Sequence, residues 1–297
     1  MTSSRAGKRI SAGQTGILLV IPAMAVFCVI ILYPFINSIL MSFTDRSLLS
    51  PTAAFTGLEN YALLFGDSGF FGVFKNTVVF VIYATLLPFT LGFIWAIILN
   101  TKFRFSEILR GITLVNWIIP GVAIGFLWMW IFHGEYGVLN GLLRLLGISR
   151  ESVNWLGRTK TAMFGVVIAR TWQMLPWYMA FLLGGLQGVS PDQLEAARMD
   201  GAGNLRSFWY IILPEMKGII SVVLILGTIG NLQHFDLIWV MTEGGPARAT
   251  TTLSIEVYRN AFKYYNMGQA AAIGSVWAVL LGCFSFIYVR RIQEGER

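Results

Sequence analysis

The chain has 297 residues, of which 56% are hydrophobic and 12% are charged, and its formal net charge is +7. Soluble domains carry roughly 45–50% apolar and about 25% charged residues, so this composition excludes a water-soluble globular enzyme and a disordered chain. The composition predicts an all-α, polytopic integral membrane protein. Membrane topology explains the surplus of Lys and Arg, since no basic run with interleaved aromatic residues indicates a nucleic-acid partner.

Six apolar stretches are long enough to cross a membrane. A hydrocarbon core of about 30 Å requires roughly 20 apolar residues in a helix. The sequence therefore predicts a single transmembrane domain over residues 1–297, with spans at about 15–40, 78–99, 112–132, 162–183, 219–240 and 270–289. Cys28 and Cys283 both fall in these apolar runs, where neither a disulfide scaffold nor a thiolate metal site is expected.

The first stretch has features of both a signal peptide and a membrane span. A basic start precedes it, and Ala23-Met24-Ala25 is a formal small-x-small cleavage site. The apolar stretch continues past this site to Ile36, which favours an uncleaved first span. Lys and Arg are modestly enriched on the N-terminal side of the membrane, above all in the first connections, so both termini are predicted to be cytoplasmic.

Two segments on the outer side are expected to contain short helices. Residues 133–160 are typical of an amphipathic surface helix, with Leu139, Leu142, Leu143 and Leu146 on one face. Residues 241–269 open with a turn, Glu243-Gly244-Gly245-Pro246, and continue into a predicted helix over 255–262.

The cytoplasmic loop at residues 186–217 is longer than two neighbouring spans require. Ser190 is expected to cap a helix that starts at Pro191, with Gln193 completing a capping box, and Gly201 supplies a left-handed stop. Asn204 is expected to cap a second short helix over 205–211, which Pro214 ends before the fifth span. A short capped helix suits insertion into a groove of another protein, although a plain connecting loop is the alternative.

The residues of this loop resemble a known signature. The spacing of Glu195-Ala196-Ala197, Gly201, Ile211 and Leu213-Pro214 is similar to that of ATP-binding-cassette importer permeases at every fixed position. Further stretches resemble the maltose-permease-like branch, which imports sugars and glycerol phosphate, in its short six-span form. These stretches are Tyr33-Pro34 with Ser42-Phe43, residues 55–61, Phe235-Asp236 with Met241-Thr242 and Gly244-Gly245-Pro246, Tyr258, Ala261-Phe262, and Gly268 with Ala270-Ala271-Ala272.

The resemblance implies a type I importer permease fold in the inner membrane of a prokaryote. It implies alternating access for a sugar, driven by a dimer of a separate ATPase, with a second similar permease and an extracytoplasmic solute-binding protein as partners. ATP and Mg²⁺ would bind to the ATPase, because this chain has no G-x-x-x-x-G-K-[ST] loop. We therefore expect no cofactor or metal on this chain. We also expect a transport subunit rather than an enzyme. The residues that the resemblance assigns to coupling are Glu195, Ala196, Ala197, Asp200, Gly201, Leu213 and Pro214.

The resemblance also places a sugar site about halfway across the membrane, on the fourth and fifth spans. Its pocket positions fall at Arg170, Gln173, Met174, Trp177, Gly227, Gly230, Asn231 and His234; the candidate ligands are Arg170, Gln173, Trp177, Asn231, Gln233 and His234. Aromatic faces and amides suit a sugar, but amides and His also bridge helices. Gly184, Gly185, Gly227 and Gly230 are expected to be close-packing sites.

Arg170 allows three interpretations, because a guanidinium is costly inside a membrane. It pairs with a carboxylate such as Asp236, it reaches a water-filled cavity, or it meets an anionic substrate such as glycerol 3-phosphate or an acidic sugar.

Two other classes of protein remain as alternatives. An ion-coupled secondary transporter would need paired intramembrane acids, whereas Asp236 is the only carboxylate in the predicted spans. The polar cluster at 231–236 argues against a structural scaffold.

Overall fold

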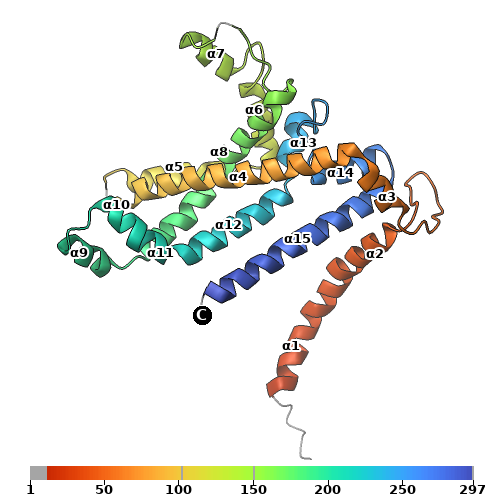
Figure 1. Ribbon diagram of the computed structural model, residues 1–297, viewed down its shortest axis with the longest axis horizontal. Helices are drawn as coiled ribbons and strands as arrows, with labels where there is room; N and C mark the ends of the chain where they lie inside the picture. Colours follow the sequence, from red (N-terminus) through yellow and green to blue (C-terminus); the bar gives the residue numbers. More distant parts are fainter. Residues whose placement is uncertain (1–11, 102, 150, 296–297) are drawn as a thin grey trace, which may run out of the picture.

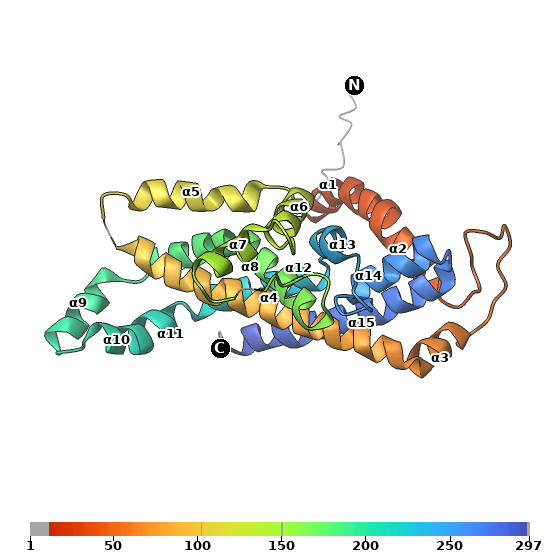
Figure 2. The same ribbon diagram turned by 90° about the horizontal axis from the view of Figure 1, so that it is seen from above.

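The computed structural model describes residues 12–101, 103–149 and 151–295, and it shows a mostly helical chain (Figures 1 and 2). Four long helices pack against one another and form the bundle. They are α4 (Ser68–Asn100), α8 (Thr159–Gln187), α12 (Lys217–Leu232) and α15 (Met267–Gly295). α4 lies along both α8 and α12, and α12 also contacts α15. The predicted all-α class is confirmed.

The first predicted span is one continuous helical stretch that projects from the bundle. It consists of α1 (Ala12–Phe27), η1 (Cys28–Leu32) and α2 (Tyr33–Met41). Figure 1 shows α1 directed away from the other helices, while α2 packs against α15. The predominantly apolar stretch of 23 residues from Leu19 to Met41 includes none that is buried within the molecule. This surface therefore requires lipid or another protein to cover it.

The third predicted span is broken. α5 (Ser106–Ile118) and α6 (Gly121–Ile131) meet at an angle of 98° instead of forming one helix over 112–132. Pro120 lacks a backbone N–H and disfavours the helical conformation at the preceding residue, and Ile119 is accordingly extended, with ψ of 131°. The apolar run at 112–132 is therefore divided between two helices, and its assignment as one membrane span stays a prediction.

The fifth predicted span, 219–240, is also interrupted. α12 ends at Leu232, and a separate helix, α13 (Asp236–Thr242), follows. At its other end, α12 is bent by 67° relative to the helical stretch that ends at Glu215. The polar residues between Asn231 and Asp236 thus lie at a break in the membrane helix rather than on a continuous helical face.

Length and composition identify three helices in the described part of the chain that could cross a membrane, or up to five if each bent pair forms one span. α8 is 29 residues long but is not among them, because Arg170 and Gln173 lower its hydropathy. The second and sixth spans are longer than expected: α4 starts at Ser68 and α15 continues to Gly295. The six-span count and the cytoplasmic termini stay predictions.

The segments 133–160 and 241–269 contain the expected short helices, and a further short helix, α3 (Glu59–Gly66), precedes α4. Within 133–160 lies α7 (Val138–Leu145), in which Leu139 packs on the core and Leu142 is exposed; Leu146, directly after the helix, is also exposed. The helix expected over 255–262 is present as α14 (Leu253–Tyr258), which continues as η3 (Arg259–Lys263).

Tyr178 of α8 occupies the centre of the helix bundle and is fully buried. Two glycines make room for it. A Cβ atom at Gly92 of α4 would lie 2.8 Å from the Tyr178 Cβ, and one at Gly227 of α12 would overlap the Tyr178 hydroxyl. A Cβ at Gly185 would lie 2.7 Å from Ile219 Cγ2, whereas Gly184 and Gly230 have open space around them. Of the four expected close-packing glycines, Gly185 and Gly227 are therefore confirmed.

We predict that Gly227→Ala destabilises the protein, because the added methyl group forces α12 away from Tyr178. Overpacking of this kind costs about 1–3 kcal/mol. The thermal unfolding midpoint of the purified protein in detergent would measure the loss. Gly230→Ala is the matched control on the same helix, and it should leave the midpoint unchanged or raise it slightly. Equal midpoints for the two variants would contradict the packing argument.

Candidate functional site

The predicted coupling loop forms a helical segment at one end of the bundle (Figure 1). The segment is made of α9 (Pro191–Met199), α10 (Asn204–Ser207), η2 (Phe208–Ile212) and α11 (Leu213–Glu215). We call residues 191–215 the coupling segment. It joins α8, which ends at Gln187, to α12, which begins at Lys217. The predicted order of helix, glycine turn and helix is confirmed.

The ends of these helices differ from the prediction in three details. Ser190 occupies the N-cap position of α9, but its side chain makes no capping hydrogen bond. Gly203 is the N-cap residue of α10, and Asn204 is its first helical residue, so Asn204 is not a cap. Pro214 lies within the helical stretch, which tolerates it in the first turn of α11, and the bend falls at Met216 instead.

Gly201 ends α9 in the left-handed conformation, with φ of +80°. The amide of Ala202 donates to the Ala197 carbonyl at 2.8 Å, and the amide of Gly201 donates to the Arg198 carbonyl at 3.0 Å. This pair of bonds is the Schellman arrangement that satisfies the last carbonyls of a helix. A Cβ at Gly201 would meet no atom within 4 Å, so the requirement for glycine comes from the backbone conformation and not from space.

The coupling segment exposes both its signature residues and large apolar side chains. Glu195, Ala196, Asp200, Gly201 and Pro214 are exposed, while Ala197 and Leu213 are half-buried. Met199 is 89% exposed and Tyr210 is 78% exposed, and Leu205 and Trp209 are also exposed. A recess of about 390 Å³ lies between α9 and η2. Several large apolar side chains exposed within one short segment are typical of a protein-binding site.

A buried polar network lies between α8 and α12. The Nε of Arg170 donates to Asn231 Oδ1 at 2.9 Å, and its Nη1 donates to Gln173 Oε1 at 2.8 Å. All three side chains are buried. The structure therefore brings together three of the six residues predicted to bind substrate, and in this conformation they bind one another.

Asn231 extends the network to α4. Its Nδ2 donates to the Ala84 carbonyl at 2.9 Å and to Thr85 Oγ1 at 3.0 Å. No sequence pattern indicated this role for Thr85, because a Thr within an apolar helix commonly bonds to its own backbone. Together these bonds connect α4, α8 and α12 at one level of the bundle.

Of the three interpretations of Arg170, an ion pair with Asp236 is not formed in this structure. The Asp236 Oδ1 lies 3.4 Å from His234 Nδ1, and the Asp236 carboxylate lies against Gly121 at the start of α6. Negative charge is favourable at that end of a helix. Within residues 12–101, 103–149 and 151–295, no ion pair involves Arg170.

The remaining predicted ligands lie at different distances from the network. His234 packs parallel to Phe80, with ring centroids 6.1 Å apart, and its Nε2 is buried without a hydrogen-bond partner among the described residues. Trp177 is half-buried and packs edge-on against Tyr178, with ring centroids 4.9 Å apart. Gln233 is exposed. His234 thus stays a candidate ligand with a free ring nitrogen, and neither Trp177 nor Gln233 takes part in the network.

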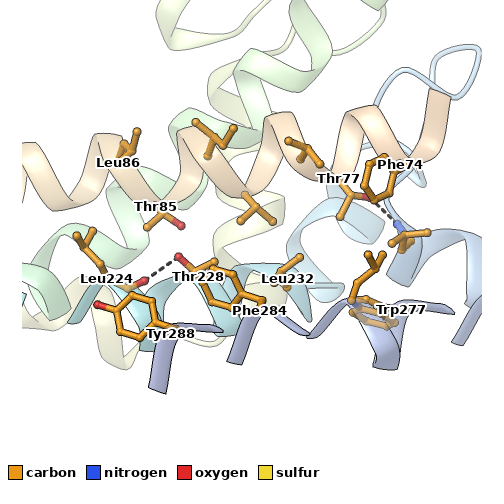
Figure 3. A pocket seen from close by; sticks show the side chains of 15 residues that line it. Phe74, Thr77, Thr85, Leu86, Leu224, Thr228, Leu232, Trp277, Phe284 and Tyr288 are labelled. Carbon is orange, nitrogen blue, oxygen red and sulfur yellow. Dashed lines mark hydrogen bonds between the residues drawn. The ribbon is translucent and has the colours of Figure 1, made fainter. Parts of the chain in front are cut away.

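The apolar cleft between α4, α12 and α15 contains none of the predicted ligands (Figure 3). Its volume is about 500 Å³. Its hydroxyl groups are already bonded: Thr228 donates to the Leu224 carbonyl, and Tyr288 donates to the Ser221 carbonyl. Thr85, which lines the cleft, is bonded to Asn231. A sugar would find few hydrogen-bond partners there, so the Arg170 network is the better candidate for the substrate site.

The structure offers no evident metal site. Across the described ranges, no group of three or more His, Cys, Asp or Glu side chains is placed to hold a metal ion. Cys28 and Cys283 are free thiols.

Comparison with known proteins assigns the family. Residues 88–295 match the family described as binding-protein-dependent transport system inner membrane component. The trehalose/maltose transport system permease protein MalF of Thermococcus litoralis is 36% identical over 280 residues, which cover 93% of each chain. The sulfoquinovosyl glycerol transport system permease protein SmoG of Agrobacterium fabrum is 34% identical, over 94% of this chain and 91% of that protein.

The fold is also that of a solved transporter. A structure of the bacterial alginate ABC transporter, in complex with alginate pentasaccharide-bound periplasmic protein, matches 97% of this chain and 98% of its own with a TM-score of 0.81 at 21% identity. The chain belongs to the family of inner-membrane components of binding-protein-dependent transport systems, as a transport subunit with the type I permease fold of ABC importers.

Proposed function

We propose that this protein is a permease subunit of an ATP-driven importer that moves a sugar across the cytoplasmic membrane of a prokaryote. The family supports a transport role, and the printed names of the relatives support a sugar as cargo. The observation that carries the proposal is the exposed coupling segment, which is continuous with the two helices that hold the Arg170 network.

The coupling segment is proposed to bind a separate ATPase. Met199 and Tyr210 are large apolar side chains left almost fully exposed, and a partner surface would bury them. Glu195 lies on the exposed side of α9, where its carboxylate is available to a cation of the partner. Gly201 fixes the sharp turn between α9 and α10, so that both helices face the partner in one orientation.

Movement of the coupling segment would act on the substrate site through α8 and α12. The connection from α8 to α9 spans only residues 188–190, and α12 begins directly after Met216. A displacement of α9 by the ATPase is thus transmitted to both helices as a rigid-body change. Alternating access then follows if α8 and α12 separate, because that movement breaks the bonds between Arg170 and Asn231 and frees their polar groups for a substrate.

The other partners follow from the family and from the unburied first span. The family description names a binding protein, and the alginate transporter was solved with a periplasmic protein bound, so we propose that an extracytoplasmic solute-binding protein delivers the sugar here. The apolar surface of Leu19–Met41, none of it buried within this chain, supports contact with a second permease and with lipid.

An anionic cargo is a second candidate, and Arg170 favours it. The guanidinium bonds to two neutral amides rather than to a carboxylate. A buried positive charge that forms no ion pair within the described chain would bind a phosphorylated or acidic sugar more tightly than a neutral one.

We predict that Glu195→Lys and Gly201→Asp each abolish uptake, while the protein stays in the membrane. The first reverses the charge presented to the ATPase, and the second puts a side chain in a left-handed conformation that costs about 1–2 kcal/mol. Uptake by proteoliposomes containing the assembled transporter measures the effect. Gln193→Lys, on another face of α9, and Gly203→Asp, at a position with ordinary φ and open space, are the controls. Wild-type uptake by either Glu195→Lys or Gly201→Asp would refute the assignment.

We also predict that Asn231→Ala lowers both uptake and stability. The change removes the hydrogen bonds to Arg170, Ala84 and Thr85, and an unsatisfied buried group costs roughly 1–3 kcal/mol. Thr85→Val removes only one of these bonds and should retain most of the uptake. If Asn231→Ala transports like the wild type at every sugar concentration tested, the network is not on the transport path.

Arg170→Gln distinguishes a neutral from an anionic cargo. Loss of a hydrogen bond to a charged group weakens binding by about 1.5–3 kcal/mol, so the apparent KM for an anionic sugar should rise by roughly tenfold or more. Uptake of a neutral sugar should change much less. Competition assays with matched neutral and phosphorylated sugars measure the ratio, and an equal effect on both sugars would exclude the anionic candidate.

A further inference from the structure

A basic cleft lies at the same end of the bundle as the coupling segment. It is formed where α4 ends, α5 begins and α8 ends, and its volume is about 720 Å³. We use the name basic cleft for the space lined by Asn100, Phe103, Arg104, Ser106, Glu107, Arg110 and Gln187. Because Gln187 is only a few residues before α9, the cleft opens near the segment proposed to bind the ATPase.

Two guanidinium groups in the cleft lack acidic partners. Neither Arg104 nor Arg110 takes part in an ion pair within the described part of the chain. Arg110 donates from Nη2 to the Leu99 carbonyl at 2.6 Å, but its Nε is buried without a hydrogen-bond partner among the described residues. One carboxylate, that of Glu107, also lines the cleft, which therefore holds a surplus of positive charge.

Arginine in this arrangement is suited to a phosphate group. Its planar donors match phosphate oxygens, and a buried donor without an acceptor is costly until a ligand supplies one. Basic pockets between membrane helices are recognised binding sites for anionic lipid headgroups. A free phosphate ion has the same charged group, so the surroundings of the cleft must distinguish the two.

An apolar stripe on α5 continues from the cleft. Ile108, Ile112 and Val115 are spaced by three and four residues, lie on one face of the helix, and are 59%, 62% and 52% exposed. From Ser106 to Ile118, α5 is about 20 Å long at 1.5 Å per residue, which is enough for one leaflet of a hydrocarbon core about 30 Å thick. A free phosphate ion would not use this stripe, whereas an acyl chain would cover it.

We propose that the basic cleft binds the phosphate of an anionic glycerophospholipid from the leaflet on the coupling-segment side, with an acyl chain along the exposed stripe of α5. The phosphate accepts hydrogen bonds from Arg104 and Arg110. The bound lipid links the start of α5 to the ends of α4 and α8, close to the point where α9 begins.

The test measures lipid binding by the full chain in its assembled transporter. The purified, delipidated complex is titrated with phosphatidylglycerol, phosphatidylcholine or inorganic phosphate, and binding is followed by native mass spectrometry and by the thermal unfolding midpoint. We expect phosphatidylglycerol to bind and to raise the midpoint. Each basic residue at an anionic surface contributes about 1 kcal/mol to binding. Arg104→Gln and Arg110→Gln should therefore each weaken the binding of phosphatidylglycerol by about fivefold.

Two controls keep the test decisive. Arg144→Gln removes an exposed arginine from α7, far along the chain from the cleft, and should leave lipid binding unchanged. Because Arg110→Gln also loses the bond to Leu99, the exposed Arg104 provides a variant with less effect on the fold. Equal binding of phosphatidylcholine, equal stabilisation by inorganic phosphate, or unchanged phosphatidylglycerol binding in the Arg104→Gln variant would each overturn the proposal.

Discussion

A guanidinium group buried among membrane helices constrains this structure more than any other single feature. Hydrocarbon offers no hydrogen-bond acceptors, so the donors of Arg170 must be satisfied from within the protein. Asn231 and Gln173 supply the acceptors, and Asn231 is itself held by Ala84 and Thr85. One charged side chain thereby fixes the relative positions of α4, α8 and α12, and the glycines around Tyr178 allow these helices to approach closely.

The same helices lead into the exposed coupling segment at one end of the bundle. α8 leads into α9, and α11 leads into α12, so the coupling segment is attached at both ends to helices of the Arg170 network. This connectivity is a physical reason to propose both substrate binding and ATPase docking on one chain, although the two proposed sites lie apart. A polar network can exchange its internal hydrogen bonds for bonds to a substrate when the helices move, whereas the apolar cleft beside α15 has few polar groups to exchange.

Local chemistry predicted the coupling segment well, because proline and glycine determine helix ends through their own backbone preferences. α9 begins at Pro191 and ends at Met199, and Gly201 then forms the left-handed turn that the sequence indicates. Hydropathy was a poorer guide to the broken spans: Pro120 interrupts an apolar run without changing its composition. The hydrogen-bond partners of Arg170 could not be predicted from the sequence. The break after Leu232 turns Asp236 toward Gly121. The rotation of one helix against another depends on tertiary packing and not on local sequence.

The central claim is that α9 is buried against a separate ATPase while the substrate site lies between α8 and α12. The most direct measurement is a structure of the assembled transporter, determined by electron cryo-microscopy with and without nucleotide. We expect residues 191–201 to lie within a groove of the ATPase, and α8 and α12 to change their separation at Arg170 and Asn231 between the two states. An ATPase bound elsewhere, with α9 exposed to solvent, would contradict the central claim.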